Sequence, residues 1–169
     1  MPPMSRLKRA LLVLTLLVSC VGCDQITKEL ARTNLAFEPP ISWFHDTVRL
    51  EYVENTGAFL SLGTSLPEDI LFVLFQFGIG AGLLTLLIVL LRSRPDSILF
   101  VIGWYLILGG GVGNLLDRVI HQGRVIDFMN LGIGPIRTGI FNLADVYITI
   151  GALMLLFVSF RPDNRLASR

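Results

Sequence analysis

Three long apolar runs constrain this chain more than any other feature of its sequence. They cover residues 70–91, 98–116 and 140–160, and each is long enough to span a bilayer core, which requires roughly 20 helical residues. Composition points the same way, since 53% of the 169 residues are hydrophobic and only 16% are charged. No repeat or linker divides the chain. We therefore expect a single membrane-embedded domain over residues 1–169.

A fourth apolar run, residues 10–23, is shorter than the other three. By length it fits either an export signal or a membrane span, and the LLVSC that ends at Cys20 looks like a lipid-attachment site. An apolar face continues past Cys20 to Leu30, so a helix over residues 7–30 is long enough to cross. We expect an uncleaved first span, and a lipid-modified N-terminal Cys20 would contradict that interpretation.

The distribution of charge predicts the orientation of these helices. With four crossings and both ends on one side, the segments on that side hold eight basic and two acidic residues. The opposite side holds six basic and eleven acidic residues. Basic residues accumulate in the short segments on the cytoplasmic side of a membrane. We therefore expect the N- and C-termini to be cytoplasmic. The longer connections then face outward, where we expect any extramembrane work to be done.

The first of these outer segments predicts a small β-sheet over about residues 41–62. Apolar side chains alternate imperfectly with polar ones from Val48 to Tyr52, and proline and Asn-Thr-Gly turn signals bound the alternation. Trp43 and Phe44 suit a position at the membrane–water interface, where aromatic rings settle. The sequence therefore predicts a sheet that lies on the outer surface of the membrane.

Two carboxylates lie where a membrane makes charge costly. Asp145 is at the head of an otherwise apolar helix, and an ionisable group in a span costs at least about 2.5 kcal/mol and commonly has a function. Asp127 lies between apolar neighbours in RVIDFMN. Both fall on the outer side, and of two carboxylates in one site, one holds a proton while the other can accept one from water. The pair suits an aspartic hydrolase, although Asp145 also fits a structural charge at a helix end.

Further polar residues mark the helix ends. Asp24 and Lys28 are four residues apart, which fits either an exposed ion pair or an acid that orients partners near the carboxylates. Asn114, Asp117 and Arg118 share one face of the third span, where an Asp–Arg pair could anchor the helix.

The glycines, cysteines and histidines do not form the patterns of a phosphate-binding or metal-binding site. Gly109 and Gly113 have the small-xxx-small spacing of closely packed membrane helices, and no Lys-Ser or Lys-Thr follows that would indicate a phosphate loop. Cys20 and Cys23 form a C-x-x-C within an apolar run, and the two histidines stand apart. We therefore expect no metal site.

Five motifs follow one another along the chain: Asp24-Gln25-Ile26-Thr27-Lys28, Asn55-Thr56-Gly57-Ala58, Gly113-Asn114-Leu115-Leu116-Asp117-Arg118, Val125-Ile126-Asp127-Phe128 and Phe141-Asn142-Leu143-Ala144-Asp145. In this order they resemble the motifs of the lipoprotein signal peptidases, the signal peptidase II family of bacterial intramembrane aspartic proteases. The resemblance covers nearly the whole chain, and its one departure is that Ala58 is followed directly by Phe59 where many members have a second small residue.

The resemblance implies a polytopic α-helical protein of the bacterial cytoplasmic (inner) membrane, with four transmembrane helices and a small outer-surface β-sheet. Its substrates would be prolipoproteins whose cysteine carries diacylglycerol, cut just before that cysteine. We expect those precursors and membrane lipid as partners of a monomer, without a cofactor, a metal or nucleic acid. By the same resemblance Asp127 and Asp145 are catalytic, and the supporting or substrate-binding residues are Asp24, Lys28, Asn55, Gly57, Asn114, Asp117, Arg118 and Asn142.

Two other classes of function remain open from the sequence. A proton-coupled transporter also uses membrane carboxylates, but paired repeats or a broken helix are not visible. Alternatively, the chain is itself a lipoprotein or an assembly factor whose carboxylates are structural. Cleavage of a precursor by the purified protein separates the enzyme from both.

Overall fold

The structure is a computed structural model that describes residues 6–56, 70, 73–93 and 97–160. Gly57, one of the expected site residues, lies outside this part of the chain, as do Phe59 and the end of the expected β segment. The elements in chain order are α1 (Arg6–Leu35), β1 (Ile41–Trp43), β2 (Val48–Asn55), the π-helix η2 (Leu74–Gly78), α3 (Ile79–Arg92), α4 (Ile98–Ile120), β3 (Val125–Ile133), β4 (Ile136–Arg137) and α5 (Leu143–Ser159).

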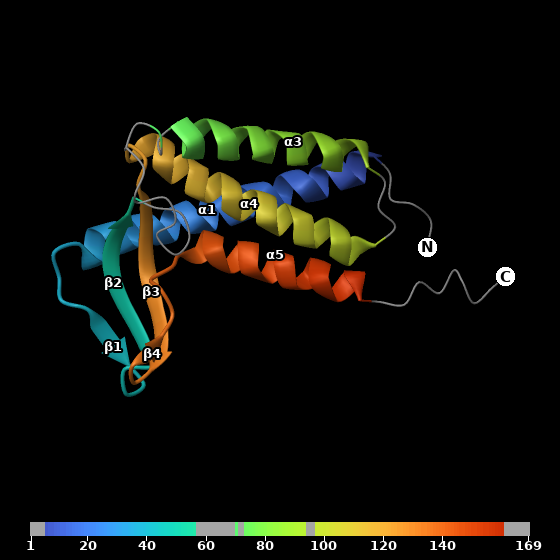
Figure 1. The fold of residues 1–169 in the computed structure, drawn as a ribbon. Coiled ribbons are helices and arrows are strands. Elements are labelled where there is room, and N and C mark those ends of the chain that lie inside the picture. Colours follow the sequence, from blue (N-terminus) through green and yellow to red (C-terminus); the bar gives the residue numbers. More distant parts are fainter. Residues whose placement is uncertain (1–5, 57–69, 71–72, 94–96, 161–169) are drawn as a thin grey trace.

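The helices lie side by side, and the sheet runs across one end of them (Figure 1). The start of α1 and the end of α5 lie at the opposite end (Figure 1). α4 is the central helix, because it contacts α1, α3 and α5. Apolar residues from α1, α3 and α4 form a buried cluster that includes Val13, Leu90 and Tyr105.

Glycines let α1 and α4 approach closely. A Cβ atom added at Gly109 would lie 2.7 Å from the Cβ of Cys20, and one added at Gly113 would lie 2.6 Å from Oδ2 of Asp24. Both distances are shorter than a real contact allows, so only glycine fits at these positions. The predicted close packing at Gly109 and Gly113 is therefore confirmed, and Cys20 is buried in the same interface.

Two helices of the described residues are long and apolar enough to cross a membrane, Leu11–Leu35 and Ile98–Ile120. Gln76–Arg92 and Leu143–Ser159 are apolar but shorter. The molecule is thus rich in apolar helices, and the expectation of four crossings stays a prediction.

Helix ends differ from those expected because packing and capping set them. α1 continues to Leu35, where Ala31 and Leu35 pack against Phe128 of the sheet. α5 begins at Leu143 instead of residue 140, because Asn142 caps it in a reciprocal capping box with Asp145.

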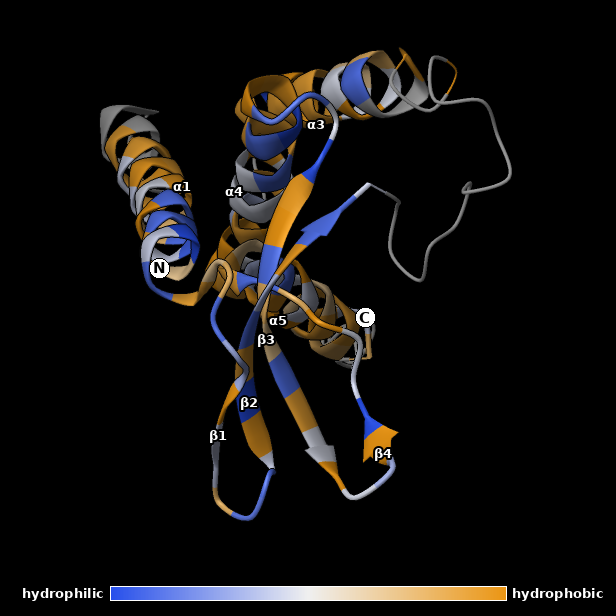
Figure 2. Cartoon of the chain, turned by 90° about the vertical axis from the view of Figure 1, so that its left-hand side faces the viewer, coloured by the Kyte–Doolittle hydropathy of each residue, from blue (hydrophilic) through white to orange (hydrophobic). Residues whose placement is uncertain are grey.

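The sheet has four antiparallel strands in the order β1-β2-β3-β4. Only β1 and β2 come from the segment that the sequence analysis assigned to it; β3 and β4 follow α4. The register shifts between Leu50, which pairs with Met129, and Val53, which pairs with Asp127. This bulge interrupts the alternation of apolar and polar residues along β2. Figure 2 shows hydrophobic and hydrophilic residues in separate bands along β2 and β3.

Candidate active site

The two predicted carboxylates come from different elements that meet where the sheet joins the helices. Asp127 lies in β3, and Asp145 lies in the first turn of α5. Asn142, the N-cap of α5, lies between them in the chain. Phe141 forms a bridge with Met129, so the start of α5 is held beside β3.

Asn142 contacts both carboxylates. Its Nδ2 donates to Oδ1 of Asp127 at 2.7 Å, and its backbone N–H donates to Oδ2 of Asp145 at 3.1 Å. Its Oδ1 accepts from the backbone N–H of Asp145 at 3.0 Å, which completes the capping box. A fully buried residue thus fixes the two carboxylates relative to each other.

Two further asparagines supply the remaining carboxylate oxygens with donors. Nδ2 of Asn55, the last residue of β2, donates to Oδ2 of Asp127 at 3.0 Å. Nδ2 of Asn114 in α4 donates to Oδ1 of Asp145 at 2.9 Å. Each of the four carboxylate oxygens therefore accepts at least one hydrogen bond from an asparagine.

Burial makes Asp127 a weaker acid. Its side chain is 3% exposed, and desolvation raises its pKa from the ordinary 3.8 to about 6. The negative charge of Asp145 raises it further, while the hydrogen bonds from Asn55 and Asn142 act in the opposite direction. Near pH 6 this residue can exchange a proton, as a general acid or base must.

A buried charged cluster supports the site from α1 and α4. Nζ of Lys28 lies 2.8 Å from Oδ2 of Asp24 and 2.9 Å from Oδ2 of Asp117, and all three side chains are at most 2% exposed. Asp24 accepts from the backbone N–H of Ala144 at 2.9 Å, and Asp117 accepts from that of Ile126 at 3.0 Å. The cluster thus binds the two segments that carry the carboxylates.

The structure brings together seven of the eight residues expected to support the site, and the eighth, Gly57, lies outside the described residues. The ion pair considered for Asp24 and Lys28 is present, but it is buried instead of exposed. Arg118 donates from Nη1 to the Asn114 carbonyl at 3.1 Å.

Gln25 was not among the expected site residues, although its Nε2 donates to Oδ1 of Asp117 at 2.7 Å. The sequence feature that could have identified Gln25 is its position in the first motif, between Asp24 and Lys28.

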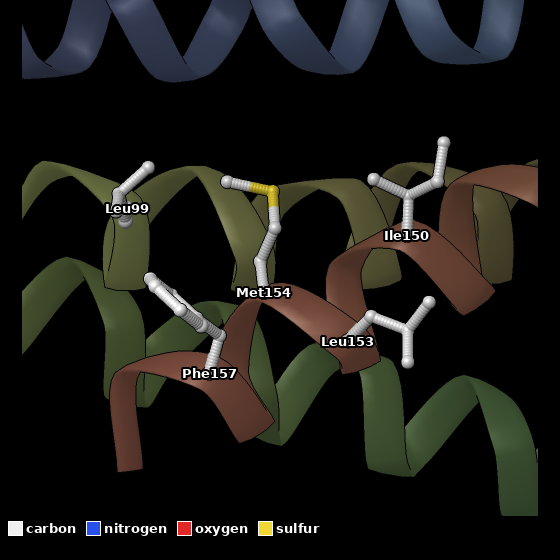
Figure 3. A pocket seen from close by; sticks show the side chains of 5 residues that line it. All are labelled: Leu99, Ile150, Leu153, Met154 and Phe157. Carbon is white, nitrogen blue, oxygen red and sulfur yellow. The ribbon is translucent and has the colours of Figure 1, made fainter. Parts of the chain in front are cut away.

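An apolar hollow of about 360 Å³ lies between α4 and α5, toward the end of the helices opposite the sheet. Figure 3 shows the side chains around it, which come mainly from one face of α5. The lining carries no carboxylate, amide or hydroxyl group, so the hollow is separate from the carboxylate site. It is lined by Leu99, Ile150, Leu153, Met154 and Phe157.

A family model and the relatives most similar in sequence agree on one family. The family described as signal peptidase (SPase) II matches residues 16–161. The chain is 31% identical over 157 residues to the lipoprotein signal peptidase of Streptococcus pneumoniae, covering 93% of this chain and 97% of that protein. It is 35% identical over 162 residues to that of Chlorobium phaeobacteroides, covering 89% and 92%. A solved bacterial membrane enzyme, 23% identical, shares the fold with a TM-score of 0.76, over 88% of this chain and 92% of that one.

Proposed function

The chain belongs to the signal peptidase II family, and from that membership we propose that it removes signal peptides from diacylglyceryl-modified prolipoproteins, cutting just before the lipid-bearing cysteine. The observation that carries the proposal is the pairing of Asp127 and Asp145 through Asn142. Two buried or half-buried carboxylates in one hydrogen-bond network are what an aspartic endopeptidase requires.

In the proposed reaction one carboxylate is ionised and the other is protonated. The ionised group takes a proton from a water molecule, whose oxygen attacks the scissile carbonyl. The protonated group donates a hydrogen bond to the carbonyl oxygen as negative charge develops there. Because close carboxylates titrate together, the two roles belong to the pair. The raised pKa of Asp127 supports a singly protonated pair.

The asparagines keep the pair ready for this reaction. Hydrogen bonds from Asn55, Asn114 and Asn142 restrict both carboxylates, so little reorganisation is needed when water and the peptide bond arrive. Arg118 is 8% exposed and its guanidinium interacts electrostatically with both carboxylates, which suits a group that limits charge repulsion or contacts the substrate.

The proposal places the chain across the bacterial cytoplasmic membrane four times, as a monomer with both termini cytoplasmic. The sheet and the carboxylates would lie near the outer face, where water can reach a peptide bond. Apolar helix surfaces would receive the diacylglyceryl chains, so that the lipid positions the bond beside the carboxylates. The position of the sheet at the end opposite the start of α1 and the end of α5 supports this arrangement.

A precursor pair tests the proposed function. The purified protein is given a precursor whose cysteine carries diacylglycerol and, separately, the same precursor with an unmodified cysteine. We expect cleavage of the lipidated form only, with mass spectrometry showing the modified cysteine at the new N-terminus. Equal cleavage of both forms, cleavage at another bond, or no cleavage would contradict the proposal.

A further inference from the structure

Lys28 makes a third contact that its two ion pairs do not require. Its Nζ donates to Oδ1 of Asn114 at 3.0 Å, in addition to its contacts with Asp24 and Asp117. An ammonium group has three N–H donors and no acceptor, so these three oxygens use its full capacity. A buried lysine therefore touches the residue that donates to Asp145.

This contact determines which way the Asn114 amide points. Lys28 can only donate, so the oxygen of the amide must face it, and the nitrogen then faces Oδ1 of Asp145 at 2.9 Å. In the reversed orientation two donors would face each other at Lys28 and two acceptors at Asp145. Each of these two mismatched contacts would leave polar groups without a hydrogen-bond partner, which is costly.

The same oxygen also contacts Asn142, whose amide direction is fixed on its own: Oδ1 of Asn142 accepts from the Asp145 N–H, and its Nδ2 donates to the Ile126 carbonyl. Oδ1 of Asn114 accepts from Nδ2 of Asn142 at 3.0 Å, and that nitrogen donates to Oδ1 of Asp127 at 2.7 Å. A reversed Asn114 would present its nitrogen to the nitrogen of Asn142. Lys28 and Asn142 therefore both donate to the Asn114 oxygen, which turns the Asn114 nitrogen toward Asp145.

We propose that Lys28 is a positioning residue which, by fixing the amide direction of Asn114, orients the hydrogen-bond donor of the carboxylate of Asp145. The inference rests on the proposed function and assigns Lys28 a role in turnover beyond holding α1 to α4. It acts through Asn114 and does not touch the substrate.

A double-mutant cycle separates this role from a merely structural one. We expect Lys28→Met to lower kcat about ten- to a hundredfold with little change in KM, the effect of losing a hydrogen bond to a charged group. In an Asn114→Ala background the same change should lower kcat less than about twofold, because the residue through which it acts is gone. Equal losses in the two backgrounds would overturn the proposal.

The pH profile of kcat/KM is the second readout. A carboxylate that loses a donor holds its proton to higher pH, so Lys28→Met should move the acidic limb upward. Lys28→Met also removes a positive charge that lowers the pKa of Asp127 directly, so the shift supports the proposal only if it is smaller in the Asn114→Ala background. The other charged groups around the pair are unchanged in that comparison; they are Asp24 of α1 and Asp117 and Arg118 of α4. An unchanged acidic limb counts against the proposal.

Gln25→Ala is the matched control within the same cluster. Gln25 donates to Asp117 at 2.7 Å, to Asp24 at 3.3 Å and to the Gly113 carbonyl at 3.4 Å. Its loss should lower thermal stability and combine additively with Asn114→Ala, without moving the acidic limb. If Gln25→Ala behaved as Lys28→Met does, the whole cluster would be structural and the specific role of Lys28 would be wrong.

A charge-balanced variant covers the case in which Lys28→Met does not fold. Lys28→Met with Asp24→Asn removes one positive and one negative charge, and an asparagine oxygen can still accept from the Ala144 N–H. The cycle is then run in the Asp24→Asn background with the same expected non-additivity. Failure of the starting protein to cleave lipidated precursor refutes the proposed function, whereas normal cleavage with an additive cycle refutes only the role of Lys28.

Discussion

Asn142 shows what a single residue contributes to this site and how far its sequence motif reveals it. The fifth motif contains both Asn142 and Asp145, and the structure shows a capping box that links them. The link from Asn142 to Asp127 in β3 and the amide direction set by Lys28 were not predictable. Both depend on side chains from other elements, which no local pattern records.

The raised pKa of Asp127 leads us to predict how the stability of the fold depends on pH. Because the folded chain binds this proton more tightly than the unfolded chain, the proton favours folding at low pH. That contribution is lost as the pH rises from about 4 through about 6, and it amounts to at most about 3 kcal/mol.

Thermal denaturation in detergent between pH 4 and pH 7 checks this. The stability of the starting protein relative to Asp127→Asn should fall across that interval. The difference in slope is the readout, since any constant effect of the new amide cancels. Parallel curves would show that the pKa of Asp127 is the same in the folded and unfolded chain.

Helices were predictable as elements because apolar runs are local, whereas their ends and the sheet pairing were not. The sheet joins β2 to β3 across a long stretch of chain, and Asn55 lies 72 residues from Asp127. The bulge in β2 further obscured the alternation that marks a strand. The close approach of α1 and α4 was predictable, because glycine spacing is a local signal.

Gly109→Ala tests that helix contact. The added methyl group would lie 2.7 Å from the Cβ of Cys20, so α1 must move away from α4, and we expect a loss of about 1–3 kcal/mol. Gly82→Ala is the control, because nothing lies within 4 Å of a Cβ added there in α3. It should leave the melting temperature unchanged or raise it slightly. Equal melting temperatures for the two variants would contradict the assigned packing.

At the scale of the whole molecule, the sheet extends across the end of the helices, beyond α5 (Figure 1). Its free end exposes Phe44 at 77%, Ile133 at 78% and Ile136 at 81%. If the helices cross the bilayer, this end of the sheet lies along the membrane surface. The sequence predicted such a position for Trp43 and Phe44 from residue type alone.

Fluorescence quenching by brominated lipids checks the position of the sheet. The chain has two tryptophans, so Trp104→Phe leaves Trp43 as the reporter. We expect bromine near the headgroup end of the acyl chains to quench Trp43 more than bromine near the chain ends. Trp43→Phe, which leaves Trp104 in α4, should show the opposite preference. Absence of quenching of Trp43 at any bromine depth would contradict the interfacial placement.

Single-turnover cleavage of lipidated precursor by Asp127→Asn and Asp145→Asn tests the central claim most directly. Both variants should bind the precursor but cut it about a hundred- to ten-thousandfold more slowly, because each removes one partner in proton transfer. The matched control is Asp46→Asn, in a side chain 45% exposed in the turn between β1 and β2, and it should cut at the normal rate. Normal cleavage by either Asp127→Asn or Asp145→Asn would contradict the aspartic mechanism.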